Sequence, residues 1–248
     1  ANVVIHCGAT PVFADCGEDF NIHAEGISSL ITTRTKAIMP VDIGGWPCDY
    51  DALNALVNTN AVKSLFRPEH PNQQQLGRIM ILSDAAHSIG ATYKNKKAGA
   101  LTDVSVTSFH AVKNLTTAEG GAICLNFTEF NCDDLYKSLY ITSLHGQTKD
   151  ALAKMQPGQW KYDIIEAGYK CNMTDILASI GLVELSRYET ETLPRRKEIV
   201  KRYMNWFSAC DWALLPPVEN ENAGSSCHLF LLRVKGVDET RRDAIIQK

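Results

Sequence analysis

Ser108-Phe109-His110-Ala111-Val112-Lys113-Asn114, followed by a small-residue turn at Gly120-Gly121, is the stretch that decides the fold of this chain. Upstream, residues 103–107 alternate valine with polar residues, which predicts a strand. Downstream, the short apolar run 121–125 predicts another strand. Lys113 is therefore expected on irregular backbone at a strand end, where ligands collect in open α/β sheets. Desolvation there would let it act as a covalent amine, although most loop lysines are simply solvated.

A second stretch, Arg78–Ser88, places a carboxylate at the end of a predicted buried strand. Residues 79–82 are continuously apolar, as in parallel strands that are buried on both faces. Asp84 follows, where a carboxylate is costly unless a cation or a hydrogen-bond donor meets it; the alternative is an N-cap for a following helix. Together, Lys113 and Asp84 would supply the amine and the carboxylate that an aldehyde cofactor with a protonated ring nitrogen requires.

Three motifs carry a resemblance to a known family: S-D-A-A-H-S-I-G-A at 83–91, S-F-H-A-V-K-N-L-T-T-A-E-G-G at 108–121 and G-Y-K-C-N-M-T-D-I at 168–176. In sequence and in order they resemble the DegT/StrS family of pyridoxal phosphate-dependent nucleotide-sugar aminotransferases. The motif that begins with S-F-H is most similar to that of the enzymes that aminate UDP-4-keto sugars. The resemblance extends over nearly all of the 248 residues.

The resemblance implies an α/β fold of the fold type I, aspartate-aminotransferase-like class, in which a mostly parallel mixed sheet is flanked by helices. Residues 1–190 would form the large cofactor-binding domain. Residues 191–248 would form the linking helix and the start of a small α/β C-terminal domain. Family members carry further segments at both ends, including a phosphate-binding turn and an aromatic that stacks on the cofactor. We therefore expect these 248 residues by themselves to hold the cofactor poorly.

The resemblance also implies the residues that hold pyridoxal phosphate. Lys113 would bond covalently to the cofactor aldehyde, and Asp84 would keep the ring nitrogen protonated through a charge-assisted bond. His87 would lie near the phenolic oxygen of the ring; the alternative is a structural histidine at a helix start. Ser108 would donate to the phosphate together with neighbouring backbone N–H groups.

Three further residues complete the implied site. Asn172 would reach the phosphate from the partner subunit of a homodimer with shared active sites, and it is also a candidate N-cap for the helix that follows. His110 and Lys170 would face the substrate. No metal site is expected.

The implied reaction is transfer of an amino group, expected to come from glutamate, to a nucleotide-linked keto-sugar in cell-surface or secondary-metabolite sugar biosynthesis. One alternative is a sugar dehydratase of the same family, but that branch carries histidine where Lys113 stands. The other is a regulatory protein that binds the cofactor without catalysis. The presence of both Lys113 and Asp84 favours transamination.

Composition bounds the partners and the compartment. The net charge is −3 and the pI is about 6.2, with no basic stripe, which argues against a nucleic-acid partner. No apolar run approaches the ~20 residues that span a bilayer, and residues 1–6 lack the features of a signal peptide. The eight cysteines have no metal-site spacing. They are interpreted as buried free thiols, which favours a reducing cytoplasm.

Periodicity and turn residues predict the remaining elements. Residues 58–77 are interpreted as a surface loop inserted relative to the family, and 148–163 as a second loop. The other predictions are the end of a helix at 1–8, strands at 12–14, 37–43 and 228–234, helices at 24–31, 49–57 and 128–143, and helices that begin at Asn172 and Pro194.

Overall fold

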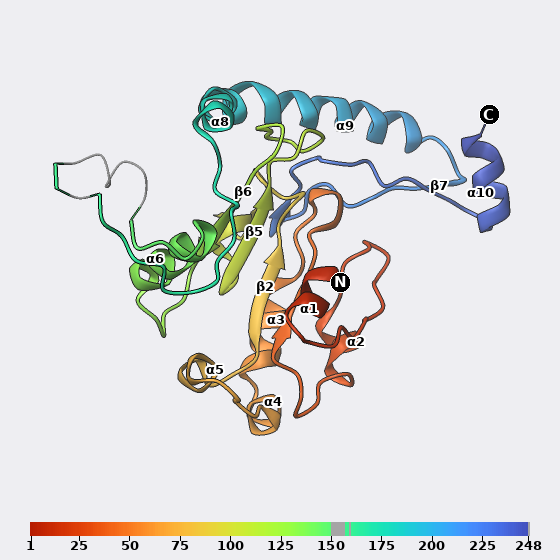
Figure 1. Cartoon of the computed structure of the whole chain (residues 1–248). Coiled ribbons are helices and arrows are strands. Elements are labelled where there is room, and N and C mark those ends of the chain that lie inside the picture. Colours follow the sequence, from red (N-terminus) through yellow and green to blue (C-terminus); the bar gives the residue numbers. More distant parts are fainter. Residues whose placement is uncertain (150–156, 159, 248) are drawn as a thin grey trace.

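A four-stranded sheet in the order β1-β2-β5-β6 lies at the centre of the computed structural model, which describes residues 1–149, 157–158 and 160–247 (Figure 1). Its strands are β1 (Ala37–Ile38), β2 (Met80–Asp84), β5 (Val104–Ser108) and β6 (Gly121–Leu125). The first three run parallel, and β6 pairs with β5 in the antiparallel direction. The expected α/β architecture with a mostly parallel mixed sheet is confirmed.

The strand register brings the two key motifs to one edge of the sheet. Asp84 lies opposite Val106, and the Ala85 N–H donates to the Val106 carbonyl at 2.8 Å. Ser108, two residues further along β5, pairs with Gly121 at the start of β6. The loop that carries Lys113 therefore leaves the sheet at the edge where β2 delivers Asp84.

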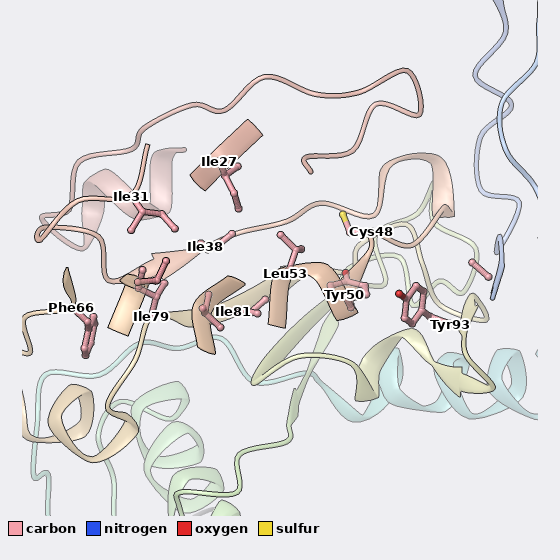
Figure 2. Packing of buried hydrophobic residues seen from close by; sticks show 13 residues of the cluster. Ile27, Ile31, Ile38, Cys48, Tyr50, Leu53, Phe66, Ile79, Ile81 and Tyr93 are labelled. Carbon is pink, nitrogen blue, oxygen red and sulfur yellow. The ribbon is translucent and has the colours of Figure 1, made fainter. Parts of the chain in front are cut away.

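The main hydrophobic core fills the space between β1, β2 and the helices α2 (Ala24–Ser28), α3 (Tyr50–Asn58) and α4 (Asn60–Leu65). Figure 2 shows Ile79 and Ile81 together with Leu53 and Ile38 in this cluster. Ile79 and Ile81 are buried, whereas Met80 and Leu82 are only half-buried. The predicted strand at 79–82 is thus correct in place, but only one of its faces is fully covered.

Helix starts follow the capping residues. The Asp49 carboxylate accepts from the Ala52 N–H at 3.0 Å and starts α3, as predicted. The segment 58–77 is not the expected loop, since it contains α4 and α5 (Pro71–Leu76). Thr59 and His70 cap these two helices. Because α5 buries no residue, its sequence has no apolar periodicity that would have predicted a helix. The helix predicted at 128–143 starts later, as α6 (Cys132–Ser143), and Asn131 is its N-cap.

The second half of the chain is dominated by α8 (Asp175–Arg187) and α9 (Leu193–Phe207), which are joined by a π-helical turn at Tyr188–Thr192. They run across one end of the molecule (Figure 1, top). Thr174 caps α8, so the alternative of Asn172 as N-cap is wrong. The proposed domain boundary at 190/191 falls inside the π turn and stays a prediction.

Short strands complete the fold. β3 (Thr92–Tyr93) pairs with β4 (Lys96–Lys97) and with β8 (Ala223–Gly224), and β7 (Ala213–Leu214) pairs with β9 (Arg233–Val234). Most of the predicted strand at 228–234 is therefore irregular, and residues 12–14 form no strand. The remaining elements are α1 (Asn2–His6), α10 (Glu239–Ile246) and the 3-10 turns Ile43–Gly45 and Ala98–Ala100.

The structure bears on the predictions for the cysteines and for membrane spans. All eight cysteines are free, but only Cys48 and Cys227 are buried, so the interpretation of most of them as buried thiols is wrong. Among the described residues, no helix is long and apolar enough to cross a bilayer. Part of the predicted loop at 148–163 lies outside the described residues.

Candidate active site

The loop between β5 and β6 holds Lys113 on a tightly bonded backbone. The Phe109 N–H donates to the Gly120 carbonyl at 2.8 Å, and the Thr117 N–H donates to the Phe109 carbonyl at 2.9 Å. Asn114 and Thr117 are buried, whereas Lys113 is half-buried. The loop is therefore anchored on both sides of the lysine, and the amine is left partly accessible.

Glycine is required where this loop closes. Gly120 has φ 158°, and a Cβ there would lie 2.5 Å from the Thr117 Oγ1 and 2.7 Å from the Met173 Cε. The third sequence motif thus lies directly against the lysine loop. Gly181 of α8 also packs closely on the loop, since its Cβ would lie 2.8 Å from the Thr117 Cγ2.

Asp84 presents a carboxylate that has no ion-pair partner among the residues that the structure describes. Its Oδ1 accepts from the Ala86 N–H at 3.1 Å, and its own N–H donates to the Pro40 carbonyl at 2.8 Å. Turns rather than a helix follow it, so the alternative of a helix N-cap is wrong. Over residues 1–149, 157–158 and 160–247, no cation forms an ion pair with this half-buried carboxylate. Over the same residues, no carboxylate forms an ion pair with the half-buried Lys113.

His87 lies within the electrostatic reach of both groups. Its Nδ1 accepts from the Gly44 N–H at 3.3 Å. Burial and the charge of Lys113 lower the pKa of His87, and the carboxylate of Asp84 partly offsets this. The alternative of a structural histidine at a helix start is wrong, because no helix begins there.

A second histidine, His228, belongs to the same cluster and was missed by the sequence analysis. Its ring lies on that of His87 with 4.4 Å between centroids, and its Nδ1 lies 2.7 Å from the Asn114 Oδ1. Burial and the neighbouring charges of His87, Lys113 and Arg196 lower the pKa of His228 to about 4. The apolar run that follows His228 favoured a strand without a functional role, so His228 was not identified as a site residue. The polar residues that precede it, Ser225 and Ser226, were the only sequence feature that could have pointed to it.

Ser108 and His110 sit at the entry of the lysine loop. The Ser108 Oγ accepts from the His110 N–H at 3.3 Å, which leaves the hydroxyl hydrogen available to an acceptor such as phosphate. The exposed His110 ring lies 3.5 Å from the Glu119 carboxylate.

Asn172 and Lys170 contact each other on an exposed segment. In the part of the chain that the structure describes, neither side chain bonds to Lys113, Asp84 or His87. Of the seven predicted residues, the structure therefore brings Asp84, His87, Ser108, His110 and Lys113 to the end of β2 and the lysine loop, whereas Lys170 and Asn172 bond only locally in the described chain.

Asp42 is a buried structural carboxyl. Its Oδ1 accepts from the Tyr50 hydroxyl at 2.6 Å and from the Cys48 N–H at 3.0 Å, while Oδ2 has no partner in the described chain. Burial raises the pKa of Asp42. The Asp42 N–H donates to the Asp84 carbonyl at 3.2 Å, so this residue supports the strand end beneath the site.

These residues fit pyridoxal phosphate by the chemistry of their donors and acceptors. A free carboxylate suits a ring N–H⁺, a free amine suits an aldehyde, and the Ser108 hydroxyl suits a phosphate. A metal is a poorer match, because no group of three or more metal-ligating side chains occurs among the described residues.

Comparison with known proteins decides the family. The family model described as the DegT/DnrJ/EryC1/StrS aminotransferase family matches residues 1–66 and 74–248. The chain belongs to this family. The unmatched residues 67–73 lie inside the segment 58–77, as expected of an insertion relative to other DegT/DnrJ/EryC1/StrS proteins.

Two relatives illustrate the similarity to DegT/DnrJ/EryC1/StrS proteins. The spore coat polysaccharide biosynthesis protein SpsC of Bacillus subtilis (strain 168) is 35% identical over 99% of this chain and 58% of its own length. The putative sugar aminotransferase Spr1654 from Streptococcus pneumoniae, in its PMP form, has a TM-score of 0.92 at 45% identity over 100% of this chain and 61% of its own.

A more distant structure is PseC from Helicobacter pylori, an aminotransferase involved in the biosynthesis of pseudoaminic acid. It has a TM-score of 0.80 at 27% identity over 100% of this chain and 58% of its own. Spr1654 has also been solved in its PLP form. The expected fold type I class and pyridoxal phosphate as the cofactor of the DegT/DnrJ/EryC1/StrS family are thereby confirmed. The chain spans about 60% of the length of these relatives.

Proposed function

We propose that this protein is a pyridoxal phosphate-dependent aminotransferase that moves an amino group from glutamate to a nucleotide-linked keto-sugar. One observation carries the proposal. Asp84 ends β2 and Lys113 lies in the loop that follows the adjacent strand β5, neither has an ion-pair partner in the described chain, and the charges of both act on His87.

The roles of the side chains follow from their chemistry. Bound pyridoxal phosphate would supply an aldehyde that condenses with amines and a ring that withdraws electrons from the neighbouring carbon. Asp84 would hold the proton on the ring nitrogen. His87 would donate to the phenolic oxygen, since its Nδ1 already accepts from the Gly44 N–H and the neutral ring carries its hydrogen on Nε2. Lys113 would bind the aldehyde and then move the substrate proton between two carbon atoms.

The substrate class rests on the names of the relatives. SpsC is named for polysaccharide biosynthesis, Spr1654 for sugar amination and PseC for pseudoaminic acid. These names share sugar or polysaccharide metabolism, and we infer a keto-sugar acceptor because transfer of an amino group to a sugar requires a carbonyl carbon on that sugar. Its nucleotide link and the glutamate donor are inferred from the family resemblance, as is a role in cell-surface or secondary-metabolite sugars.

Two alternative functions fit the site less well. The dehydratase branch of the family carries histidine where this chain has Lys113, and a regulatory protein has no need of a proton-moving lysine beside an unpaired Asp84. Both residues are present at one sheet edge. Transamination therefore remains the function that the site supports best.

Assembly and compartment form part of the proposal. We expect a homodimer in which Asn172 serves the partner's site, because it is exposed and bonded only locally in the described part of its own chain. A cytoplasmic location agrees with eight free cysteines, three of which (Cys7, Cys16 and Cys171) are exposed.

The lysine assignment is tested by chemical trapping. Borohydride fixes the cofactor irreversibly to the lysine that holds it, so peptide mapping of the treated protein should find the label on Lys113. The Lys113→Ala variant should lose the label. The matched control is Lys97→Ala, which removes an exposed lysine paired with Glu189 and should keep it. A label on any other lysine contradicts the assignment.

The reaction is tested by mass spectrometry of the products formed with glutamate and a panel of nucleotide keto-sugars. We expect a mass change from ketone to amine on one sugar and conversion of glutamate to its keto acid. Loss of water without gain of nitrogen would instead support the dehydratase alternative.

A further inference from the structure

The two neighbouring histidines, His87 and His228, differ in their place in the fold and in their hydrogen bonding. His87 follows β2, whereas His228 lies between β8 and β9, and the two rings meet with 4.4 Å between centroids and 34° between planes. The Ser226 Oγ donates to the His87 carbonyl at 2.6 Å, which ties the two segments together at this point. Each ring has one nitrogen fixed by a neighbour, so the hydrogen on each ring can be located.

The orientation of the Asn114 amide fixes the hydrogen on His228. The Tyr188 hydroxyl donates to the Ile89 carbonyl at 2.6 Å, so its oxygen must accept from Asn114. Asn114 Nδ2 also donates to the Ser226 carbonyl at 2.9 Å, which identifies this atom as the nitrogen. The Asn114 Oδ1 therefore faces His228 Nδ1, and an oxygen acceptor requires the hydrogen to be on Nδ1.

The surroundings of His228 keep its ring neutral. His87, Lys113 and Arg196 are the titratable groups that act on it, and each can carry positive charge. The guanidinium of Arg196 donates to the His228 carbonyl at 3.4 Å, so this cation is held beside the ring. In a neutral ring with hydrogen on Nδ1, the Nε2 atom is a lone-pair acceptor. No hydrogen-bond partner for Nε2 occurs in the residues that the structure describes.

We propose that His228 is a substrate-binding residue whose Nε2 accepts a hydrogen bond from a hydroxyl group of the keto-sugar. Next to it, His87 has the opposite tautomer, with a donor at Nε2, so the two adjacent rings offer one donor and one acceptor. A hydroxyl can donate to the His228 acceptor, whereas a carbonyl oxygen or a hydrogen atom at the same position cannot. A site built to bond a hydroxyl discriminates strongly against analogues that lack it. This inference rests on the proposed function, since it names a contact of the same site.

The first test reads the tautomers and needs no catalysis. Nitrogen-15 NMR of the full-length, cofactor-free protein at pH 7 should show His228 with hydrogen on Nδ1 and a bare Nε2. His87 should show the reverse pattern. The variants His228→Asn and His87→Gln assign the signals. A charged His228, or one with hydrogen on Nε2, overturns the proposal whatever the enzyme catalyses.

The second test separates the two ring nitrogens in the loaded enzyme. His228→Asn keeps a donor near the Nδ1 position for Asn114 but removes Nε2, whereas His228→Gln places an amide near Nε2. We expect the Asn variant to raise the KM for the keto-sugar roughly tenfold to a hundredfold, as for one lost hydrogen bond in a desolvated site. The Gln variant should recover part of this loss. The half-reaction with glutamate should keep its rate in both.

Controls make each outcome informative. His6→Asn, an exposed histidine on α1, should change neither parameter, and thermal unfolding identifies any variant that fails to fold. An unchanged KM in a folded His228→Asn variant, or an equal loss in the glutamate half-reaction, overturns the proposal. Failure of the proposed function is distinguishable, because the wild-type protein would then lack the glutamate half-reaction while the NMR result would stand.

Discussion

At the residue scale, the site contains two charged side chains, Asp84 and Lys113, that form no ion pair in the described chain. In the described part of the chain, half-buried Asp84 has a backbone N–H donor but no cation as a partner, which is costly for a carboxylate by itself. A bound ring N–H⁺ would offset that cost. The fold thus holds the carboxylate in place before the cofactor arrives.

The Asp84→Asn substitution tests this role. An amide has nearly the same shape but cannot hold the ring proton, so we expect cofactor binding to survive and turnover to fall by roughly a hundredfold to a thousandfold. Absorbance of the bound cofactor and steady-state rates measure the two effects. Asp51→Asn, at an exposed carboxylate that pairs with Lys94, is the matched control and should leave turnover intact. Near wild-type turnover in Asp84→Asn would reduce Asp84 to a structural acceptor.

The raised pKa of Asp42 predicts how the stability of the protein depends on pH. Its folded pKa is raised, mainly by burial, so the unfolded chain releases this proton at lower pH than the native protein does. The contribution of Asp42 is therefore fully present at low pH and is lost as pH rises through the folded pKa. Asp42→Asn removes the ionisation, and the variant should gain about 1–3 kcal/mol over the wild type above that pKa. Urea unfolding at several pH values measures this difference; parallel curves for the two proteins would contradict it.

At the element scale, α8 approaches the lysine loop closely through Gly181. Alanine normally stabilises a helix interior by about 1 kcal/mol relative to glycine, yet a Cβ at Gly181 would lie 2.8 Å from the Thr117 methyl group. We expect Gly181→Ala to lower the melting temperature and to weaken cofactor retention. Adding Thr117→Ser should restore both, because it removes the methyl group and keeps the hydroxyl that donates to the Glu119 carbonyl at 2.8 Å.

The control for this experiment lies in α2. Gly26 is also helical, but apart from its chain neighbours and the backbone of its own helix, no atom of the described residues lies within 4 Å of the Cβ that alanine would add. Gly26→Ala should therefore stabilise the protein by roughly 0.5–1 kcal/mol. If Gly181→Ala raised the melting temperature as much as Gly26→Ala, the close approach of α8 would impose no constraint on the loop.

The elements differ in how well the sequence predicted them, and local chemistry explains the difference. β2 and the Lys113 loop were predictable because an apolar run ends in a carboxylate and a lysine stands between two strand patterns. The start of α3 was predictable because Asp49 caps it. α5 was not, since it buries nothing and its only signals are His70, Pro71 and a terminal glycine.

The C-terminal segment shows a different limit. Residues 228–234 are apolar, as in a strand, but their backbone is held by pairing with distant residues: the N–H groups of His228 and Leu229 donate to the Gly44 carbonyl. Such contacts between residues far apart in sequence leave no periodicity to detect. His228 was missed for this reason, and so was its place beside His87.

At the scale of the whole molecule, a large apolar surface is left uncovered on the chain. No residue of α8 is buried; Ile176 is 76% exposed, Leu182 70% and Val183 62%. These apolar side chains of α8 are thus not covered by the described part of its own chain. Contiguous apolar patches of this kind mark interaction surfaces, which agrees with the proposed homodimer.

Shared sites can be tested by mixing two inactive subunits. Lys113→Ala removes the covalent amine and Asn172→Ala removes the residue proposed to serve the partner. If the sites are shared, a mixed dimer contains one site that has both residues, so part of the activity should return. Native mass spectrometry verifies that subunits exchange. Verified exchange without any recovery would mean that each site is built within one chain.

The docking of residues 226–229 on the turn at Gly44 and Gly45 has a consequence for biosynthesis. The Ser226 N–H donates to the Gly45 carbonyl, and the N–H of His228 to that of Gly44, both at 3.0 Å. A ribosome that adds ~5–20 residues per second makes Lys113 on the order of ten seconds before His228. The Lys113 loop is thus synthesised well before His228, and His228 reaches its place beside His87 only after residues 226–229 have docked on Gly44 and Gly45.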